Sequence, residues 1–491
     1  MKTFLIVCSP NHRRRTPQRS VIQRMNRSLT WIRRVQRARQ TRKRRSSKGV
    51  FMKKWKLKNK KADIEKLSRT LKLSKPFCNL LVNRGFSTPE TIRNYLEAQK
   101  LPLHDAKELK DCDKACQVIE NHIEQGNKIW IIGDYDVDGI ISTYILKQSL
   151  SVLSDRVTYY IPDRMEDGYG INENIIDAAL SDGASLIVTC DNGISALEAL
   201  AYAKEKDLDV VVTDHHEPVT QKSSNGEELC LPSADAIVNP KQADCGYPFN
   251  KICGATVAFK VVERLFQRLK RENPIKEELV GLVAVATVCD VVDLIDENRV
   301  IVKQGLEKLA SKPNPGLQML MKATGIDSKE LTSFHLGFVI GPCLNAAGRI
   351  ETAEKSLKLL EAQSPELAEE YAKELVELNS IRKDMTKEGT GRIDALVKEQ
   401  LAEDPVIVAH DPSIHESIAG IIAGRIKEKY HRPTLVLTGE KEKVKGSGRS
   451  IEEYDLYREM ADFRELYEKF GGHPMAVGLS MREENILPLR K

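Results

Sequence analysis

Three carboxylates occupy five consecutive positions in one segment of the chain: Asp134, Asp136 and Asp138. Like charges this close repel one another unless protons or cations neutralise them, and oxygen-rich clusters suit Mg²⁺ or Mn²⁺. The pattern Asp-x-Asp-x-Asp-Gly also begins a calcium-binding EF-hand loop. That loop would need glutamate where this chain has Ile145 and a helix where this chain has an apolar strand. Helix-capping aspartates in a solvated loop are an equally good interpretation of this segment alone.

Further metal-binding side chains follow three other apolar runs, Leu186–Thr189, Val210–Thr213 and Leu282–Cys289. These side chains are Asp191, Asp214, His215, His216 and Asp290. A single aspartate in such a place is usually a helix cap, and a lone histidine is usually structural. The repeated pattern favours one shared site. We expect it to hold two metal ions about 3.5 to 4 Å apart, which activate water and stabilise charge on a phosphoryl group.

The elements that position these loops are predicted from short, β-branched runs that alternate with helical stretches. The runs are Ile129–Ile132, Val157–Ile161, Leu186–Thr189 and Val210–Thr213. Such alternation predicts an α/β fold with a parallel sheet and right-handed crossovers. Ligands in these sheets bind beyond the carboxyl ends of the strands, which is where the acidic loops fall.

The rest of the chain is predicted to be mainly helical, with a smaller α/β region at its end. The predicted segments are short helices up to about residue 125, a helical region over 274–322, a small-residue loop over Gly341–Arg349, a long helix over 365–403 interrupted near Gly389 and Gly391, strands over Val406–Ala409 and Thr434–Thr438, and a helix over Glu416–Tyr430. The long helix is expected to bridge two domains.

Length and charge limit the possible functions. A chain of 491 residues predicts two or three domains, and no apolar run approaches the roughly 18 residues that span a membrane. Residues 1–51 hold sixteen basic and no acidic residues, so the remainder carries 60 basic against 70 acidic residues, despite a formal net charge of +6. Nucleic-acid binding must therefore rest on local sites.

The first 51 residues and the cysteines bear on where the protein works. We interpret residues 1–51 as a basic extension that is disordered or not naturally translated, although a transit peptide has a similar composition. The ten cysteines are scattered and include no Cys-x-x-Cys, which is poor spacing for zinc or disulfides. A reducing, cytoplasmic location is expected.

Six motifs in order resemble those of a known enzyme family, over roughly Ile64 to Met481. The first three resemble motifs of the DHH phosphoesterase superfamily, and the last three resemble those of its RecJ branch of single-strand-specific exonucleases. The motifs are Asp134–Gly139, Asp191–Ile194, Asp214–His216, Asn345–Arg349, Lys445–Ser450 and Gly471–Pro474. Gly139 and the Asn345–Arg349 segment favour the RecJ branch over other DHH enzymes.

The resemblance implies a domain order and an activity. It implies a helical lead-in over 52–125, a DHH domain over 126–360, a connecting helix over 361–403 and a DHHA1 domain over 404–491, with the active site between the two domains. The implied activity is hydrolysis of single-stranded DNA from a 5′ phosphate to 5′-mononucleotides in recombination and repair, with Mn²⁺ or Mg²⁺. DNA-repair or single-strand-binding proteins are expected partners, no membrane is involved, and the oligomeric state is left open.

The resemblance also implies roles for individual residues. The implied metal ligands are Asp136, Asp138, Asp191, His215 and Asp290, with Asp134 at the edge of the site. Asp214 would buttress the histidines, and His216 would meet the scissile phosphate. The implied substrate-binding residues are Arg164, Asn345, Arg349, Ser447, Arg449 and His473. For Arg164 alone a surface salt bridge is the ordinary interpretation, for Gly471 and Gly472 a turn, and for Ser450 a helix cap.

Two departures from the family leave alternatives open. Asp293 stands where the family commonly has proline, and the chain ends at Lys491, where bacterial RecJ continues into a strand-gripping OB-fold. The main alternative is a DHH enzyme for short oligonucleotides, cyclic dinucleotides or polyphosphate, which would share the metal ligands. A non-catalytic nucleic-acid-binding module is the second alternative.

Overall fold

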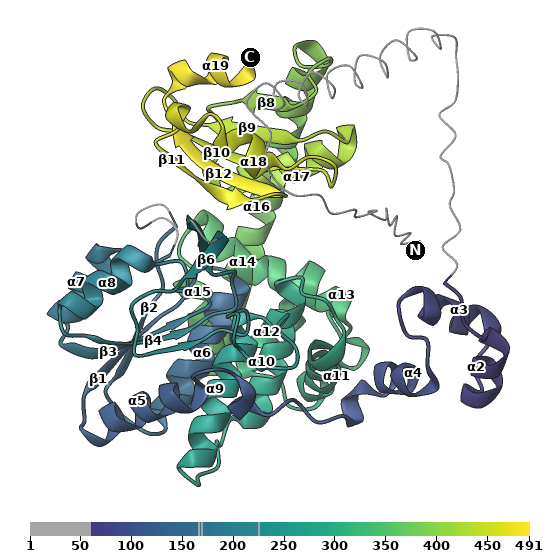
Figure 1. Cartoon of the computed structure of the whole chain (residues 1–491), viewed down its shortest axis with the longest axis vertical. Coiled ribbons are helices and arrows are strands. Elements are labelled where there is room, and N and C mark those ends of the chain that lie inside the picture. The colour runs from purple at the N-terminus through teal and green to yellow at the C-terminus, as the bar shows by residue number, and fades with distance from the viewer. Residues whose placement is uncertain (1–59, 165–166, 168–169, 224–225) are drawn as a thin grey trace. The chain divides into compact units, whose positions relative to one another are not determined.

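The computed structural model describes residues 60–164, 167, 170–223 and 226–491 (Figure 1). The predicted extension over residues 1–51 lies outside these described residues. The chain divides into two compact units, Met1–Gly85 and Phe86–Lys491, and the second unit contains all the predicted site residues.

The described part of the first unit is a pair of short helices, α2 (Ile64–Leu71) and α3 (Lys75–Asn83). The Asp63 side chain begins α2 by accepting a hydrogen bond from the Lys66 N–H. The second unit opens with α4 (Pro89–Leu96) and, after two short 3₁₀ turns, α5 (Cys112–Glu124). The predicted short helices before residue 125 are therefore confirmed.

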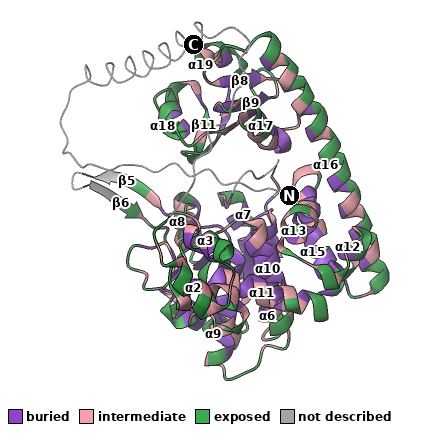
Figure 2. Cartoon of the chain, turned by 90° about the vertical axis from the view of Figure 1, so that its right-hand side faces the viewer, coloured by how far each residue is buried: buried purple, intermediate pink, exposed green. Residues whose placement is uncertain are grey.

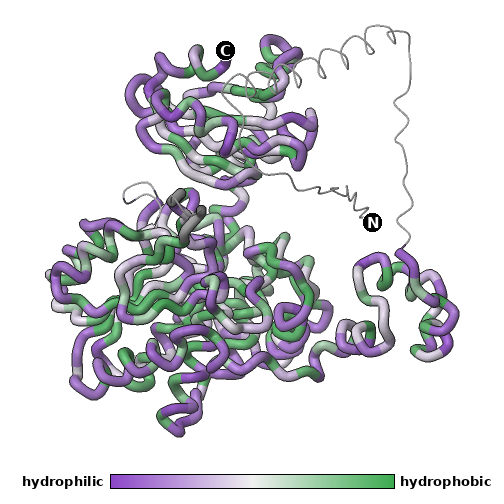
Figure 3. The backbone as a smooth tube through the Cα atoms, in the orientation of Figure 1, coloured by the Kyte–Doolittle hydropathy of each residue, from purple (hydrophilic) through white to green (hydrophobic). Residues whose placement is uncertain are grey.

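A five-stranded parallel sheet forms the centre of the second unit, in the order β2-β1-β3-β4-β7. Its strands are β1 (Lys128–Ile132), β2 (Val157–Tyr160), β3 (Ala184–Cys190), β4 (Asp209–Thr213) and β7 (Ala236–Val238). The first four strands confirm the prediction, and β7 was not predicted. The central strands β3 and β4 are mainly green in the hydropathy view, because both faces of the sheet are covered there (Figure 3).

Alternate side chains of β1 show how helices cover the two faces. Ile129 and Ile131 belong to one buried cluster with side chains of α5, α6 (Val137–Ser151), α9 (Gly254–Arg268) and α10 (Lys276–Cys289). Trp130 and Ile132 pack with α7 (Glu173–Ser181) and α8 (Leu197–Glu205) on the other face. Most of α10 is buried (Figure 2), and this helix lies in the core against α6 and α9.

A helical layer continues the domain after α10. It comprises α11 (Asp296–Ser311), α12 (Pro315–Ala323), α13 (Ser333–His335), the π-helix η4 (Leu336–Ile340), α14 (Gly341–Ile350) and α15 (Glu354–Leu360). The prediction of a loop over Gly341–Arg349 is wrong, because these residues form α14. Their small side chains allow a close helix contact: a Cβ on Gly341 would overlap Cys289 Sγ at the end of α10. Tertiary packing here outweighs the low helix propensity of glycine.

The long helix α16 (Pro365–Glu399) leads from this layer to the last domain. It begins at Ser364, whose side chain accepts a hydrogen bond from the Leu367 N–H. The predicted interruption near Gly389 and Gly391 is wrong, because both glycines lie inside the continuous helix.

The last domain is a smaller α/β unit with a mixed sheet in the order β11-β12-β10-β9-β8. Its main elements are β8 (Ile407–His410), α17 (Glu416–Tyr430), β9 (Thr434–Thr438), β10 (Val444–Arg449), β11 (Lys469–His473) and β12 (Ala476–Met481). β8 and β9 pair in parallel, and the other pairs are antiparallel. The two predicted strands and the predicted helix of this domain are confirmed.

Two local interpretations are corrected in the last domain. Ser450 does not cap the helix α18 (Leu456–Ala461); its hydroxyl donates to the Tyr454 carbonyl, and Asp455 caps that helix. Gly471 and Gly472 lie in the edge strand β11 and not in a turn.

The remaining elements are short. They are the hairpin β5 (Val219–Ser223) and β6 (Gly226–Cys230), the helix α19 (Ile486–Arg490), and the 3₁₀ turns η1 (Ala98–Lys100), η2 (Ala106–Glu108), η3 (Ser328–Glu330), η5 (Arg464–Leu466) and η6 (Glu483–Asn485). Among the described residues, none of the helices combines the length and the apolar character that crossing a bilayer requires.

Candidate functional site

The acidic loop after β1 is buried although it carries three carboxylates. Asp134 is 4% exposed and Asp138 is 2% exposed. Asp136 begins α6, because its Oδ1 accepts hydrogen bonds from the N–H groups of Asp138 (2.8 Å) and Gly139 (3.2 Å). The capping interpretation therefore holds for Asp136, but the loop is not solvated. Helix capping alone leaves the other two buried carboxylates without an explanation.

Both carboxylate oxygens of Asp138 point at the N-terminus of α9. They accept hydrogen bonds from the N–H groups of Gly254 (2.6 Å) and Ala255 (2.8 Å). The helix dipole and these unpaired amides stabilise the negative charge. Gly254 also has to be glycine, because a Cβ there would lie 2.5 Å from Asp191 Oδ1. Sequence analysis missed this contact.

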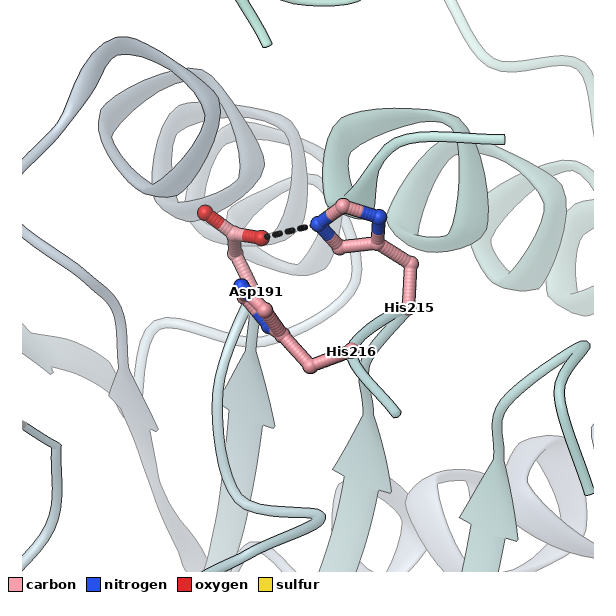
Figure 4. A group of neighbouring side chains, drawn as sticks. All are labelled: Asp191, His215 and His216. Atoms are coloured by element: carbon pink, nitrogen blue, oxygen red, sulfur yellow. Dashed lines mark ion pairs between the residues drawn. The ribbon is translucent and has the colours of Figure 1, made fainter. Parts of the chain in front are cut away.

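His215 joins three of the predicted ligands. Its Nε2 lies 3.1 Å from Asp191 Oδ1 and 3.6 Å from Asp138 Oδ2, and its Nδ1 lies 3.8 Å from Asp290 Oδ2. Asp191 follows β3, His215 follows β4, and Asp290 caps the end of α10. Figure 4 shows Asp191 and His215 directed toward each other from adjacent strands. The structure thus brings four of the predicted ligands, Asp138, Asp191, His215 and Asp290, together at the carboxyl end of the sheet.

Two overlapping groups of side chains have the spacing of a metal site. One is Asp138, His215 and Asp290, the other is Asp191, His215 and His216, and the ligand atoms of each group lie within 4.8 Å of one another. Asp191 Oδ1 is buried, yet no described group, His215 included, donates a hydrogen bond to it. A buried carboxylate oxygen without a donor is costly unless a cation or proton meets it. This donor set fits divalent cations.

Charge crowding perturbs the acids of this cluster. Burial, and then the negative charge of Asp136, raise the pKa of Asp134 to about 7. Burial, and then the charge of Asp138, raise the pKa of Asp290 to about 8 and that of Asp191 well above its usual range. Several carboxylates this close cannot all ionise without a compensating positive charge. A cation would supply that charge.

Asp214 organises the two histidines. Its carboxylate accepts hydrogen bonds from the N–H groups of Ile194, His215 and His216 and from Nδ1 of His216 (2.8 Å). Burial opposes ionisation of Asp214, but these hydrogen bonds lower its pKa below the usual value. Burial also opposes protonation of His216, yet the bond to Asp214 raises the pKa of His216 to about 9. In contrast, burial lowers the pKa of His215, which suits a neutral ligand.

Three predicted arginines lie close enough to influence one another. The Arg164 guanidinium stacks 4.9 Å from the ring centre of Tyr135. Burial, and then the charges of Arg164 and Arg382, lower the pKa of Arg349 to about 10. Burial, and then Arg164, lower that of Arg449. None of the three forms an ion pair with a described residue, so the salt-bridge interpretation of Arg164 is not supported and the cluster carries net positive charge.

The last domain contributes a serine and an arginine that face α17. Ser447 and Arg449 lie on β10, and a Cβ on Gly420 of α17 would approach Ser447 Oγ and Arg449 Nη2 to 2.9 Å. The Arg349 guanidinium donates a hydrogen bond to the carbonyl of Ser417, also at the start of α17 (2.8 Å). Gly420 was not predicted from the sequence. The available signal was a glycine inside an apolar helix, which indicates a close approach of another element.

The remaining predicted residues differ in their placement. Asn345 on α14 accepts a hydrogen bond from the Val137 N–H (3.2 Å), so it contacts the acidic loop. His473 lies exposed on the edge strand β11, where its Nδ1 accepts a hydrogen bond from the Met475 N–H. Among the described contacts, His473 therefore touches no other predicted site residue. Asp293 forms an exposed ion pair with Lys251 and adds no carboxylate to the cluster.

Family models and sequence relatives match most of the chain. The N-terminal domain of the DHH family matches residues 128–287, and the DHHA1 domain matches residues 403–490. The single-stranded-DNA-specific exonuclease RecJ of Bacillus subtilis (strain 168) is 38% identical over 429 residues, which cover 87% of this chain and 53% of the relative. RecJ of Escherichia coli (strain K12) is 36% identical over 405 residues, covering 77% and 67% respectively. The chain thus spans about half to two thirds of the length of these relatives.

Solved structures agree with these matches. RecJ from Thermus thermophilus in complex with Mn²⁺ superposes with a TM-score of 0.73 at 29% identity, covering 87% of this chain and 59% of the other. A manganese-bound exonuclease RecJ gives a TM-score of 0.67 at 31% identity, covering 79% and 93%. The Mg²⁺ complex of the Thermus protein gives 0.67 at 26% identity, covering 87% and 58%.

Proposed function

Because this chain belongs to the RecJ family of DHH phosphoesterases, we propose that it removes 5′-mononucleotides from single-stranded DNA in the 5′ to 3′ direction. The observation that carries the proposal is the convergence of Asp138, Asp191 and Asp290 on His215. The matched relatives are named single-stranded-DNA-specific exonucleases, which supports a single strand as the substrate. Recombination and repair of DNA are the proposed setting.

The proposed cofactor is a pair of Mn²⁺ or Mg²⁺ ions. The residues proposed to hold them are Asp136, Asp138, Asp191, His215 and Asp290, with Asp134 at the edge. Asp138, Asp191, His215 and Asp290 belong to the two groups with the spacing of a metal site, and Asp134 and Asp136 lie in the same acidic loop as Asp138. When bound, such ions lower the pKa of water and stabilise charge on the phosphoryl oxygens. The orphaned oxygen of Asp191 and the raised pKa values of Asp134 and Asp290 support a site that requires positive charge.

We assign His216 to the scissile phosphate. Asp214 holds Nδ1 of the ring, so Nε2 is left to donate a hydrogen bond to a phosphate oxygen. Without bound cations, the hydrogen bond to Asp214 raises the pKa of His216 to about 9, which favours the protonated imidazole. A cationic donor stabilises negative charge that develops on the reacting phosphate. Asp214 positions this ring and the backbone of both histidines.

The 5′ phosphate is assigned to the positive cluster. Arginine presents a planar fork that matches phosphate oxygens, and Arg164, Arg349 and Arg449 form no ion pair with a described carboxylate. Ser447, Asn345 and His473 complete the proposed substrate contacts. Desolvation of the arginines strengthens their attraction for an anion.

Some finer proposals follow from family membership. We propose a helical lead-in over 52–125, a DHH domain over 126–360, a connecting helix over 361–403 and a DHHA1 domain over 404–491. DNA-repair or single-strand-binding proteins are proposed partners. A cytoplasmic location is proposed, and the free state of all the described cysteines is compatible with its reducing conditions.

The test is a substrate comparison with Mn²⁺ and with Mg²⁺. A 5′-phosphorylated single strand, a dinucleotide and a polyphosphate are offered to the wild-type chain and to Asp290→Asn. The proposal expects rapid cleavage of the strand and loss of at least about 100-fold in Asp290→Asn. Preference for the dinucleotide or polyphosphate would assign another DHH activity, and inert wild-type protein with both metals would support a binding module.

Asp290→Asn is preferred to alanine changes at Asp136 and Asp138, because those two side chains also begin α6 and hold the start of α9. Loss of a helix cap costs about 1 kcal/mol and would mix folding with chemistry. Asp293→Asn is the matched control, since Asp293 lies three residues further on in an exposed ion pair.

A further inference from the structure

Two exposed phenylalanines lie stacked on the helical stretch that leads into α14. Phe334 is 56% exposed and Phe338 is 70% exposed. Their ring centres are 5.0 Å apart and the rings are inclined by 22°. Scattered exposed apolar side chains are common, but a stacked pair of exposed rings forms a flat apolar surface that gains from a partner.

The same helical stretch carries proposed substrate contacts at its other end. The backbone stays right-handed helical where α13 meets η4 and where η4 meets α14, so residues 333–350 run as one helix with a π segment. Phe334 and Phe338 are one turn apart, and Asn345 and Arg349 follow further along. At 1.5 Å per residue, the 15 positions from Phe334 to Arg349 cover about 22 Å.

Close packing fixes this helix beside the acidic cluster. A Cβ on Gly337 would lie 3.2 Å from Val288 Cγ1, and a Cβ on Gly341 would overlap Cys289 Sγ. Val288 and Cys289 are the last residues of α10, directly before Asp290. Phe338 directly follows Gly337 in the sequence, so its backbone lies next to the contact with the end of α10.

The surroundings of the pair combine apolar side chains with two positive charges. A recess beside Ser333, the neighbour of Phe334 in the sequence, is lined by several leucines and by Thr332, Arg299 and Lys303. Arg299 donates to the Tyr95 carbonyl and lies over the Tyr95 ring. Lys303 donates to the Leu96 carbonyl and to Gln99. Neither cation forms an ion pair with a described carboxylate, so their positive charge is held at this recess without being neutralised. Flat rings beside uncompensated positive charge are the combination that binds single-stranded nucleic acid.

We propose that Phe334 and Phe338 form a stacking platform for bases downstream of the scissile bond of a single strand. This inference rests on the proposed function, with the 5′ phosphate at Arg349. At a stacked spacing of about 3.4 Å per nucleotide, 22 Å corresponds to at most about six nucleotides. The platform therefore contacts bases within that distance of the 5′ end and leaves a dinucleotide untouched.

The test compares the double variant Phe334→Leu/Phe338→Leu with the wild type. Leucine keeps an exposed apolar side chain but removes the flat ring. Phe463→Leu is the control, because Phe463 is 49% exposed in the last domain and stacks on no other described ring. Substrates are a 5′-phosphorylated strand of about 12 nucleotides and a dinucleotide.

The double variant is expected to raise KM for the longer strand at least about fivefold with little change in kcat, because stacking contributes about 1–3 kcal/mol per base. Cleavage of the dinucleotide and all properties of Phe463→Leu should match the wild type. A series of strands, each with a single 2-aminopurine at one of the first several positions, reports stacking directly. Quenching of the 2-aminopurine fluorescence near the third to sixth bases should disappear in the double variant.

If the double variant matched the wild type on both substrates and the quenching were unchanged, the platform would be overturned. An equal loss of activity on both substrates would also overturn it, because such a loss would show a structural role. A changed oligomeric state with unaltered DNA binding would overturn it in favour of a protein contact. If the wild type cleaved neither substrate, the proposed function would fail, while the quenching measurement would still decide the platform.

Discussion

Removing the metal should make the stability of this protein fall as the pH rises. Burial, and then the charge of Asp136, raise the pKa of Asp134 from 3.8 to about 7. Burial, and then the charge of Asp138, raise the pKa of Asp290 from 3.8 to about 8. In metal-free protein these groups keep protons that the unfolded chain has already lost.

The sign follows from proton linkage. A carboxyl whose folded pKa is raised binds more protons in the folded state, so the free energy of unfolding falls between its unfolded and folded pKa values. One pKa unit corresponds to about 1.4 kcal/mol, so above about pH 5.5 Asp134 contributes on the order of 2 kcal/mol and Asp290 on the order of 3 kcal/mol to this fall. His216 acts in the same direction, since its stabilising charge is complete below 6.5 and is lost through about pH 9.

The assay is thermal unfolding in chelator and in Mn²⁺ at about pH 5.5, 7 and 8.5. One kcal/mol shifts Tm by about 2–4 °C in a domain of roughly 200 residues, so metal-free Tm should fall by on the order of 8 °C or more. Mn²⁺ should restore Tm, and the difference should widen as the pH rises, because a cation binds the ionised acids.

Two variants sharpen this measurement. Asp134→Asn should make Tm of the metal-free protein depend less steeply on pH, because the amide oxygen can still accept a hydrogen bond from the Tyr135 N–H without carrying charge. Asp293→Asn, in an exposed ion pair, should leave the slope unchanged. A metal-free Tm that stays constant or rises from pH 5.5 to 8.5 would refute the argument that uncompensated carboxylates crowd this site.

Two further substitutions test individual contacts. Gly254→Ala should reduce metal affinity and the proposed exonuclease activity by at least about tenfold, because its Cβ would displace the Asp191 carboxylate; titration with Mn²⁺ measures this. Gly424→Ala, with open space around its Cβ, should keep full activity, and equal behaviour of the two variants would contradict the packing argument. Asp214→Asn should move the alkaline limit of kcat/KM from near pH 9 toward 6.5 or below, because His216 loses its carboxylate partner; an unchanged pH profile would remove His216 from the mechanism.

The strands and their terminal loops were predictable because local patterns determine them. Four β-branched runs became β1 to β4, and their polar ends met at one edge, as parallel pairing requires. The strand β7 escaped prediction because three residues, Ala236–Val238, carry too little pattern to be distinguished from a loop. The helix α14 was missed for the opposite reason, since Gly341, Gly348 and Pro342 disfavour a helix locally while the packed neighbours require one.

The part of the site that could not be predicted from the sequence consists of backbone N–H groups. Asp138 was identified as an acid that needs positive charge, and part of that charge comes from the N–H groups of Gly254 and Ala255, which belong to no recognisable side-chain pattern. With both oxygens held by a helix N-terminus, Asp138 is fixed in direction before a cation arrives, so the site loses little side-chain entropy on binding. Asp191 Oδ1 has no such donor, so its charge depends on a cation or a proton instead.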